Sequence, residues 1–139
     1  MIQRIQSLWL FAAAACAVLT FKFPFYSGTK AEQGKPALYT SLIASGSFLI
    51  LALTAILFIG ALFILFLYKK RKIQFRLSLL AFILSLLNIF LYYRQTTQFI
   101  DGTYSITALL SLAIPVLFLL AARGIFRDEK LVKSMDRLR

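Results

Sequence analysis

Residues Ser47–Tyr68 read SFLILALTAILFIGALFILFLY, and residues 69–72 that follow read KKRK. The first stretch contains no charged side chain, and a helix needs about 20 apolar residues to cross about 30 Å of hydrocarbon. Adding the apolar residues that precede it, we predict a membrane-spanning helix at 42–68. The basic run marks the point where this helix leaves the membrane.

The rest of the chain has a similar composition. Of its 139 residues, 60% are hydrophobic and 15% are charged, whereas a soluble domain carries about 25% charged residues. One small core cannot bury this apolar excess, so lipid must be part of the solvent. The length suits a single domain that covers residues 1–139.

Three further apolar runs, at 7–23, 73–93 and 104–122, are long enough to span a membrane. KKRK joins the second and third spans tightly, and RQTTQFIDG, residues 94–102, joins the third and fourth. We therefore predict an all-α membrane protein with a four-transmembrane-helix bundle.

The first run could instead be a secretory leader, which also combines a positive start with an apolar stretch. AAAC at Ala13–Cys16 faintly resembles a lipoprotein cleavage box. However, the apolar stretch before Cys16 is short, and the residue three positions earlier is alanine rather than leucine. We expect the run to be retained as a span.

The basic residues predict the orientation. With four spans, both termini and the KKRK loop lie on one side, and the positive-inside rule makes the side richer in Lys and Arg cytoplasmic. We therefore expect a multi-pass membrane protein with both termini in the cytoplasm. The predicted inner side holds Arg4, Lys69, Lys70, Arg71, Lys72, Arg76, Arg123, Arg127, Lys130, Lys133, Arg137 and Arg139, and the outer side holds Lys22, Lys30, Lys35 and Arg94.

The outer loop at 24–41 has two interpretations. Ser27-Gly28 and Gly34-Lys35-Pro36 have turn chemistry, and the flanking residues have some strand character, which predicts a small hairpin. Alternatively, Pro36 occupies the first turn of a long second helix, where its missing N–H is tolerated. The sequence leaves both open.

Several classes of function are disfavoured. The chain has no histidine and one cysteine, Cys16, so His-dependent catalysis, His-based metal or haem sites and an intrachain disulfide are excluded. All five acids lie outside the predicted spans. A proton-coupled transporter would need an ionisable residue inside a span, so this class of transporter is disfavoured. The basic residues alternate with apolar runs instead of forming one surface, which argues against nucleic-acid binding. We expect no catalytic residues, cofactor or metal.

Small and polar residues mark the packing faces of two spans. In the third, Ser78, Ala81, Ser85, Asn88 and Tyr92 recur at steps of three and four, and in the fourth Ala108, Ser111, Pro115 and Ala122 do the same. Such faces permit close helix approach and interhelical hydrogen bonds. We predict a polar contact of Ser85 and Asn88 with Ser111, and a kink at Pro115.

The tail, 123–139, contains an apolar stripe among charges, which predicts a short cytoplasmic amphipathic helix that Gly124 separates from the last span. It could lie on anionic lipid or dock on a partner protein. The acids in the tail weaken a purely lipid-binding interpretation, and the sequence leaves both open. The candidate partner-binding residues are Arg127, Asp128, Glu129, Lys130, Asp136 and Arg137, with Gln3, Arg4 and Gln6 at the other terminus.

The opening MIQRIQSLWL and the ending RDEKLVKSMDRLR resemble the two ends of a family of Bacteroidota membrane proteins, domain of unknown function 4293. The resemblance implies a four-span inner-membrane protein and brings no activity or catalytic residue.

The functional expectation is a non-enzymatic integral membrane protein, an accessory or assembly subunit that acts through helix packing and its cytoplasmic tail. Its partners would be the bilayer and another membrane or cytoplasmic protein. The alternative is a small transporter or channel formed by oligomerisation, with a wet path lined by Thr54, Ser78, Ser85, Asn88 and Ser111. The sequence does not determine the oligomeric state.

Overall fold

A computed structural model describes residues 2–30 and 38–136, and the side chains of 5–30 and 38–134. Four long helices dominate it: α1 (Ile2–Lys22), α2 (Phe48–Phe66), α3 (Arg71–Thr96) and α4 (Ala108–Asp136). Each helix is long and apolar enough to cross a membrane. The four predicted spans are therefore confirmed, with shifted ends, and the chain is a multi-pass membrane protein.

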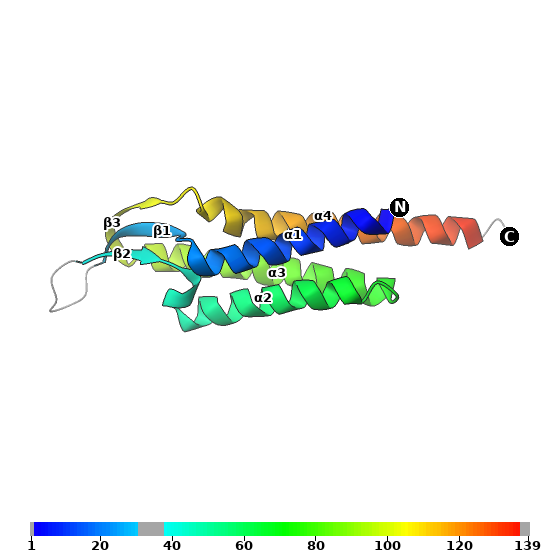
Figure 1. Ribbon diagram of the computed structural model, residues 1–139, viewed down its shortest axis with the longest axis horizontal. Coiled ribbons are helices and arrows are strands. Elements are labelled where there is room, and N and C mark those ends of the chain that lie inside the picture. The colour runs from blue at the N-terminus through cyan, green and yellow to red at the C-terminus, as the bar shows by residue number, and fades with distance from the viewer. Residues whose placement is uncertain (1, 31–37, 137–139) are drawn as a thin grey trace.

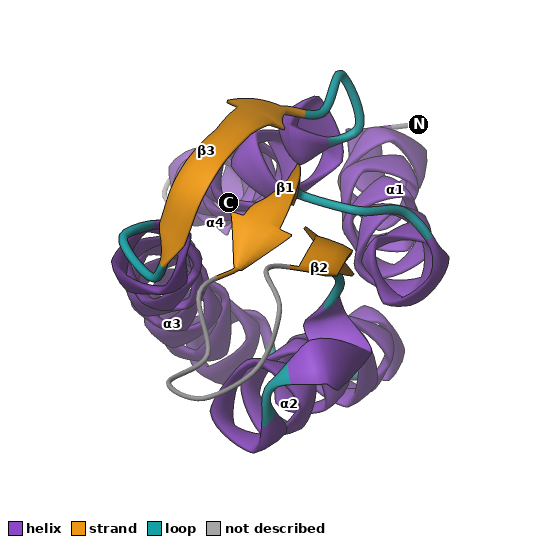
Figure 2. Cartoon of the chain, turned by 90° about the vertical axis from the view of Figure 1, so that its left-hand side faces the viewer, coloured by secondary structure: helices purple, strands orange, loops and turns teal. Residues whose placement is uncertain are grey.

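The helices form a ring in which each one packs on two neighbours, in the order α1, α2, α3, α4 (Figure 2). Small side chains line the centre, among them Ala13, Ala17, Ala61, Ala81 and Ala121, all at most 5% exposed. In lipid, no hydrophobic effect drives the helices together. They associate through van der Waals packing, which small residues strengthen because they let the helices approach closely.

Large apolar side chains cover the outside of the ring. Phe11 is 64% exposed, Ile59 is 62% exposed and Ile83 is 60% exposed. In water such a surface would drive aggregation, whereas in hydrocarbon it is the expected solvent-facing side.

The two ends of the bundle differ (Figure 1). At one end lie the beginning of α1, the connection between α2 and α3, and the last turns of α4, which extends beyond the other helices. We call this the basic end. At the opposite end, which we call the sheet end, lie all three β-strands.

The sheet corrects the all-α prediction. Strands β1 (Tyr26–Lys30), β2 (Leu38–Leu42) and β3 (Phe99–Tyr104) form an antiparallel sheet in the order β2-β1-β3. The hairpin interpretation of the outer loop is therefore confirmed for the described residues. The long-second-helix interpretation is wrong, because α2 begins at Phe48. Pro36 lies outside the described residues.

The third strand was not predicted. Residues 99–104 were assigned to a connection and to the start of the fourth span, yet they pair with β1, and α4 begins only at Ala108. Similarly, Leu42 belongs to β2 and not to the second span. Hydropathy alone does not distinguish an apolar strand from the end of a helix, since both are apolar runs.

The tail prediction also needs correction. Residues 123–136 are not a separate short helix, because α4 runs without interruption from Ala108 to Asp136. Gly124 lies inside this helix, where its lack of a side chain serves close packing: a Cβ there would lie 2.9 Å from Cγ of Gln6 in α1. The glycine marks a helix contact, not a helix end.

Candidate functional site

The polar face predicted on α3 lies inside the bundle. Ser78, Ala81, Ser85, Asn88 and Tyr92 are all buried, at most 5% exposed. The predicted face of α4 is buried as well; its members are Ala108, Ser111, Pro115 and Ala122. Both faces are confirmed as packing surfaces.

The partner predicted for Asn88 was wrong. Its Nδ2 donates to Oγ1 of Thr54 in α2, at 3.1 Å, and not to Ser111 in α4. Oγ of Ser85 donates to the backbone carbonyl of Phe82, one turn earlier in its own helix. α3 packs on both α2 and α4, so spacing along one helix cannot decide which neighbour receives a given side chain.

Tyr92 extends this polar contact to α1. Its hydroxyl lies within hydrogen-bonding reach of Thr54 and of Thr20 at the end of α1. Three helices are thus linked through one buried cluster. Within the described residues, Oδ1 of Asn88 and Oγ of Ser78 are buried without a hydrogen-bond partner.

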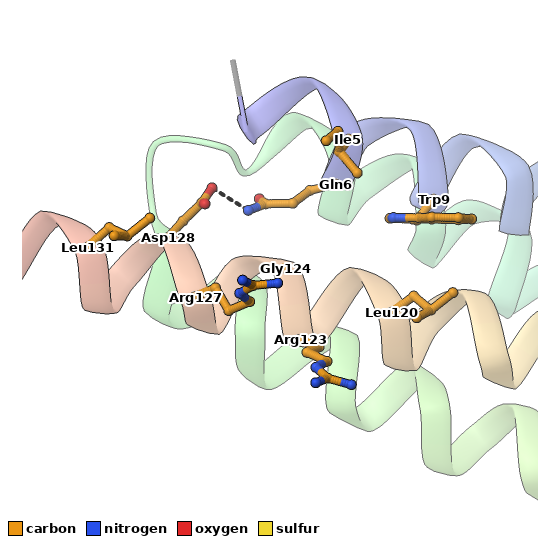
Figure 3. A pocket seen from close by; sticks show the side chains of 9 residues that line it. All are labelled: Ile5, Gln6, Trp9, Leu120, Arg123, Gly124, Arg127, Asp128 and Leu131. Carbon is orange, nitrogen blue, oxygen red and sulfur yellow. Dashed lines mark hydrogen bonds between the residues drawn. The ribbon is translucent and has the colours of Figure 1, made fainter.

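A groove of about 430 Å³ lies between α1 and α4 at the basic end (Figure 3). Its lining residues are Ile5, Gln6, Trp9, Leu120, Arg123, Gly124, Arg127, Asp128 and Leu131. Gln6 reaches across from α1, and its Nε2 donates a hydrogen bond to Oδ2 of Asp128. Both side chains are buried, Gln6 at 6% and Asp128 at 7% exposure.

Asp128 is only half satisfied by this bond. Its other carboxylate oxygen, Oδ1, is buried and has no hydrogen-bond partner among the described residues. An ionised carboxylate is acceptor-only and can take several donors. Leaving one of its oxygens buried and unpaired carries the full desolvation penalty of that atom. The lining of the groove therefore includes a carboxylate with one buried, unpaired oxygen, and two arginines.

A second groove, of about 660 Å³, lies on the other side of α4 at the same end. It is lined by the KKRK loop with Ile73 and by α4 residues Glu129, Val132 and Lys133. Glu129 pairs with Lys133 at 3.1 Å, one helical turn on, as expected for residues four apart on a helix. The four loop cations face no other described acid in this groove.

The candidate partner-binding residues divide accordingly. Arg127 and Lys130 are exposed and Glu129 is partly buried, whereas Gln6 and Asp128 are buried against each other and are better explained by contact within the chain. The remaining residues, Gln3, Arg4, Asp136 and Arg137, have side chains outside the described part of the structure.

Gln6 and Asp128 were both predicted as partner-binding residues, but their contact with each other was not predicted. The sequence also did not predict that Trp9, Leu120 and Gly124 line a groove. One signal was present: Gly124 stands four residues before Asp128, on the same helix face. A small residue one turn from an acid in a membrane helix marks a face that another helix approaches closely.

Comparison with known proteins gave one match. A family model described as Domain of unknown function (DUF4293) matches residues 2–138, almost the whole chain, in agreement with the resemblance of its two ends. The searches of curated proteins and of solved structures found no match.

Proposed function

The chain belongs to the family of Domain of unknown function (DUF4293), and we propose that it is a non-enzymatic accessory or assembly subunit of the bacterial inner membrane. It binds the acidic surface of a partner protein at its basic end, in the cytoplasm. The observation that carries the proposal is the C-terminal part of α4, which continues past the bundle (Figure 1). This part exposes apolar and basic side chains together.

In this extension the described acidic side chains are bound within the chain, whereas basic side chains remain free to contact a partner. The described acids are engaged within the chain, Asp128 by Gln6 and Glu129 by Lys133. Lys130 remains exposed next to Leu131, which is 49% exposed, and Val132, which is 38% exposed. A surface with apolar residues among cations fits an acidic partner with an apolar centre, since opposite potentials favour association.

The proposed orientation in the membrane rests on the positive charges of the basic end. The beginning of α1, the end of α4 and the KKRK loop lie at the basic end. In the sequence, eleven of the 16 Lys and Arg belong to the two chain ends and this loop, and a twelfth, Arg76, follows the loop by one helical turn in α3. An excess of Lys and Arg is characteristic of cytoplasmic segments, which supports an inward-facing basic end and an outward-facing sheet.

Single-cysteine labelling tests this orientation. In a Cys16→Ser background, a cysteine at Ser134 should react with a membrane-impermeant maleimide only after the cells are opened. A cysteine at Thr103, which is exposed on β3, should react in intact spheroplasts. The opposite pattern overturns the orientation and with it the cytoplasmic partner.

Charge reversal tests the partner. We expect purification in mild detergent to retain a stoichiometric protein that dissociates at high salt and that is lost with Arg127→Glu/Lys130→Glu. Truncation after Lys130 should also release it, and this cut leaves the contact between Gln6 and Asp128 intact. The matched control is Arg94→Glu, an exposed charge at the sheet end. A chain that purifies alone, or a partner insensitive to both changes, contradicts the proposal.

A transporter is the second candidate, favoured by the unpartnered polar atoms of Ser78 and Asn88 in the core. These side chains are buried inside one copy, at 0% and 4% exposure, so a path lined by them runs through a single bundle and not between copies. Flux into liposomes that disappears with Asn88→Leu supports this function. Absence of flux for ions and small polar solutes argues against it.

A further inference from the structure

The groove between α1 and α4 contains an acceptor that the described chain does not use. Oδ1 of Asp128 is buried without a partner, although Gln6 binds the other oxygen of the same carboxylate. Burying an ionised group without compensation is expensive. A ligand with N–H donors and a positive charge would remove that penalty.

The other walls of the groove indicate what kind of molecule carries this donor. Ile5, Trp9, Leu120 and Leu131 make most of its lining apolar, and Arg123 and Arg127 stand one helical turn apart on α4 (Figure 3). Arginine binds phosphate through paired N–H donors. The groove thus combines a carboxylate, two guanidinium groups and an apolar wall.

The position of the groove at one end of the bundle is where lipid headgroups are expected. The groove lies at the basic end, where α1 begins and α4 leaves the bundle. Trp9 lines it, and tryptophan is enriched at the boundary between hydrocarbon and headgroups. A molecule in this groove therefore meets acyl chains on one side and charged headgroups on the other.

We propose that the groove between α1 and α4 is a binding site for a phospholipid with a primary amine, of the phosphatidylethanolamine class. Its ammonium group donates to Oδ1 of Asp128, its phosphate contacts Arg123 and Arg127, and an acyl chain lies along Trp9 and Leu120. Because Oδ1 of Asp128 is buried, binding requires that neighbouring side chains move aside. Arg127 and Leu131 line the groove with Asp128 and are exposed, and exposed side chains change rotamer rapidly.

The headgroup chemistry distinguishes this lipid from other lipids. A primary ammonium has three N–H donors, whereas the quaternary ammonium of phosphatidylcholine has none. Phosphatidylglycerol can contact the arginines but brings no cation to Asp128. Soluble phosphoethanolamine has both charges but lacks the acyl chains, so it tests whether the apolar wall takes part.

The experiment compares these four molecules on the full chain in detergent, by native mass spectrometry and by thermal shift. We expect phosphatidylethanolamine to bind at least about tenfold more tightly than phosphatidylcholine or phosphatidylglycerol, the range of a charge-assisted hydrogen bond. Soluble phosphoethanolamine should bind weakly or not at all. Equal binding of the three lipids overturns the proposal.

Asp128→Asn is the decisive variant, because its amide oxygen still accepts from Gln6 while the negative charge is lost. It should reduce the preference for phosphatidylethanolamine to about that of phosphatidylcholine, a loss on the order of tenfold. Glu129→Gln is the matched control, as it removes the neighbouring charge, which is paired with Lys133, and it should preserve the preference. An unchanged preference in Asp128→Asn contradicts the assignment.

A second measurement does not depend on any variant folding. In a series with no, one, two and three N-methyl groups on the ethanolamine, affinity for the wild-type chain should fall as N–H donors are replaced. A flat series means that the amine is not recognised, which overturns the site even if the lipid binds.

Discussion

At the sheet end, aromatic rings from three segments pack against one another, whereas at the basic end α1 and α4 leave a groove between them. Phe25 stacks on Tyr92 with ring centroids 4.6 Å apart, and Tyr26 meets Tyr104 edge-on at 5.0 Å. The basic end has instead a hydrogen-bonded pair, Gln6 and Asp128, and exposed cations. The sheet end is closed mainly by packing and keeps a pocket of about 170 Å³ between α2 and α3, whereas the basic end has grooves of about 430 and 660 Å³.

The difference follows from the connections. At the sheet end, two chain segments cross between helices and pair as strands, so the central strand β1 finds backbone partners on both sides. At the basic end only one short turn joins two helices, and Gln74 of α3 donates to the carbonyl of Ile64 at the end of α2, at 3.2 Å. We expect structural damage from substitutions at the first end and changes in binding from those at the second.

The largest effect should come from Tyr92→Ala. Tyr92 is 1% exposed, its ring stacks on Phe25, and its hydroxyl lies within hydrogen-bonding reach of Thr20 and Thr54. Truncating a buried aromatic residue costs about 3–5 kcal/mol, measured by thermal or denaturant unfolding in detergent. Tyr93→Ala, at an exposed neighbour, should cost less than about 1 kcal/mol. Similar losses for both would mean that the sheet end is not closed by packing.

Gly28→Ala should have the next largest effect. A Cβ at Gly28 would lie 2.1 Å from the carbonyl oxygen of Asp101 and 2.6 Å from Cα of Gly102, so β1 and β3 would have to separate. Overpacking of this kind costs about 1–3 kcal/mol, and we expect the upper half of that range. Gly46→Ala, which meets nothing within 4 Å, is the control. Equal unfolding midpoints for the two variants would falsify the close pairing of these strands.

At the basic end, Gly124→Ala tests the contact of α4 with α1. The new Cβ would press on Gln6, so we expect a net loss of about 1 kcal/mol after the usual helix gain of alanine over glycine. In Gly60→Ala the methyl group meets nothing within 4 Å, and the same gain should stabilise α2. If both variants gain stability, the contact between Gln6 and α4 is looser than its geometry suggests.

The smallest effect concerns the hydrogen bond between Asn88 and Thr54, which lies between the two ends of the bundle. A double-mutant cycle of Asn88→Leu with Thr54→Val should give a coupling energy of about 0.6 kcal/mol, the average for interhelical hydrogen bonds in membranes. The corresponding cycle of Asn88→Leu with Ser111→Ala should give no coupling. A coupling to Ser111 and none to Thr54 would restore the pairing that the sequence suggested.

Local composition determined the number of spans, the distribution of positive charge and the buried faces of α3 and α4. The physical reason is that a helix in lipid must satisfy its own backbone and be apolar over about 20 residues. Both properties belong to one continuous stretch of chain. A face such as Ser78, Ser85 and Asn88 is likewise set by helical spacing within one stretch.

Tertiary structure decided which stretches meet. The pairing of residues 26–30 with 99–104, the choice of Thr54 over Ser111 by Asn88, and the bond of Gln6 with Asp128, 122 positions away in the chain, depend on how whole helices are rotated and placed. The role of Gly124 inside α4 also depends on this placement, because α1 packs against the position where a larger residue would have its side chain. Spacing along one segment carries no information on the rotation of its neighbour, and it is this rotation that brings a buried carboxylate to the groove between α1 and α4.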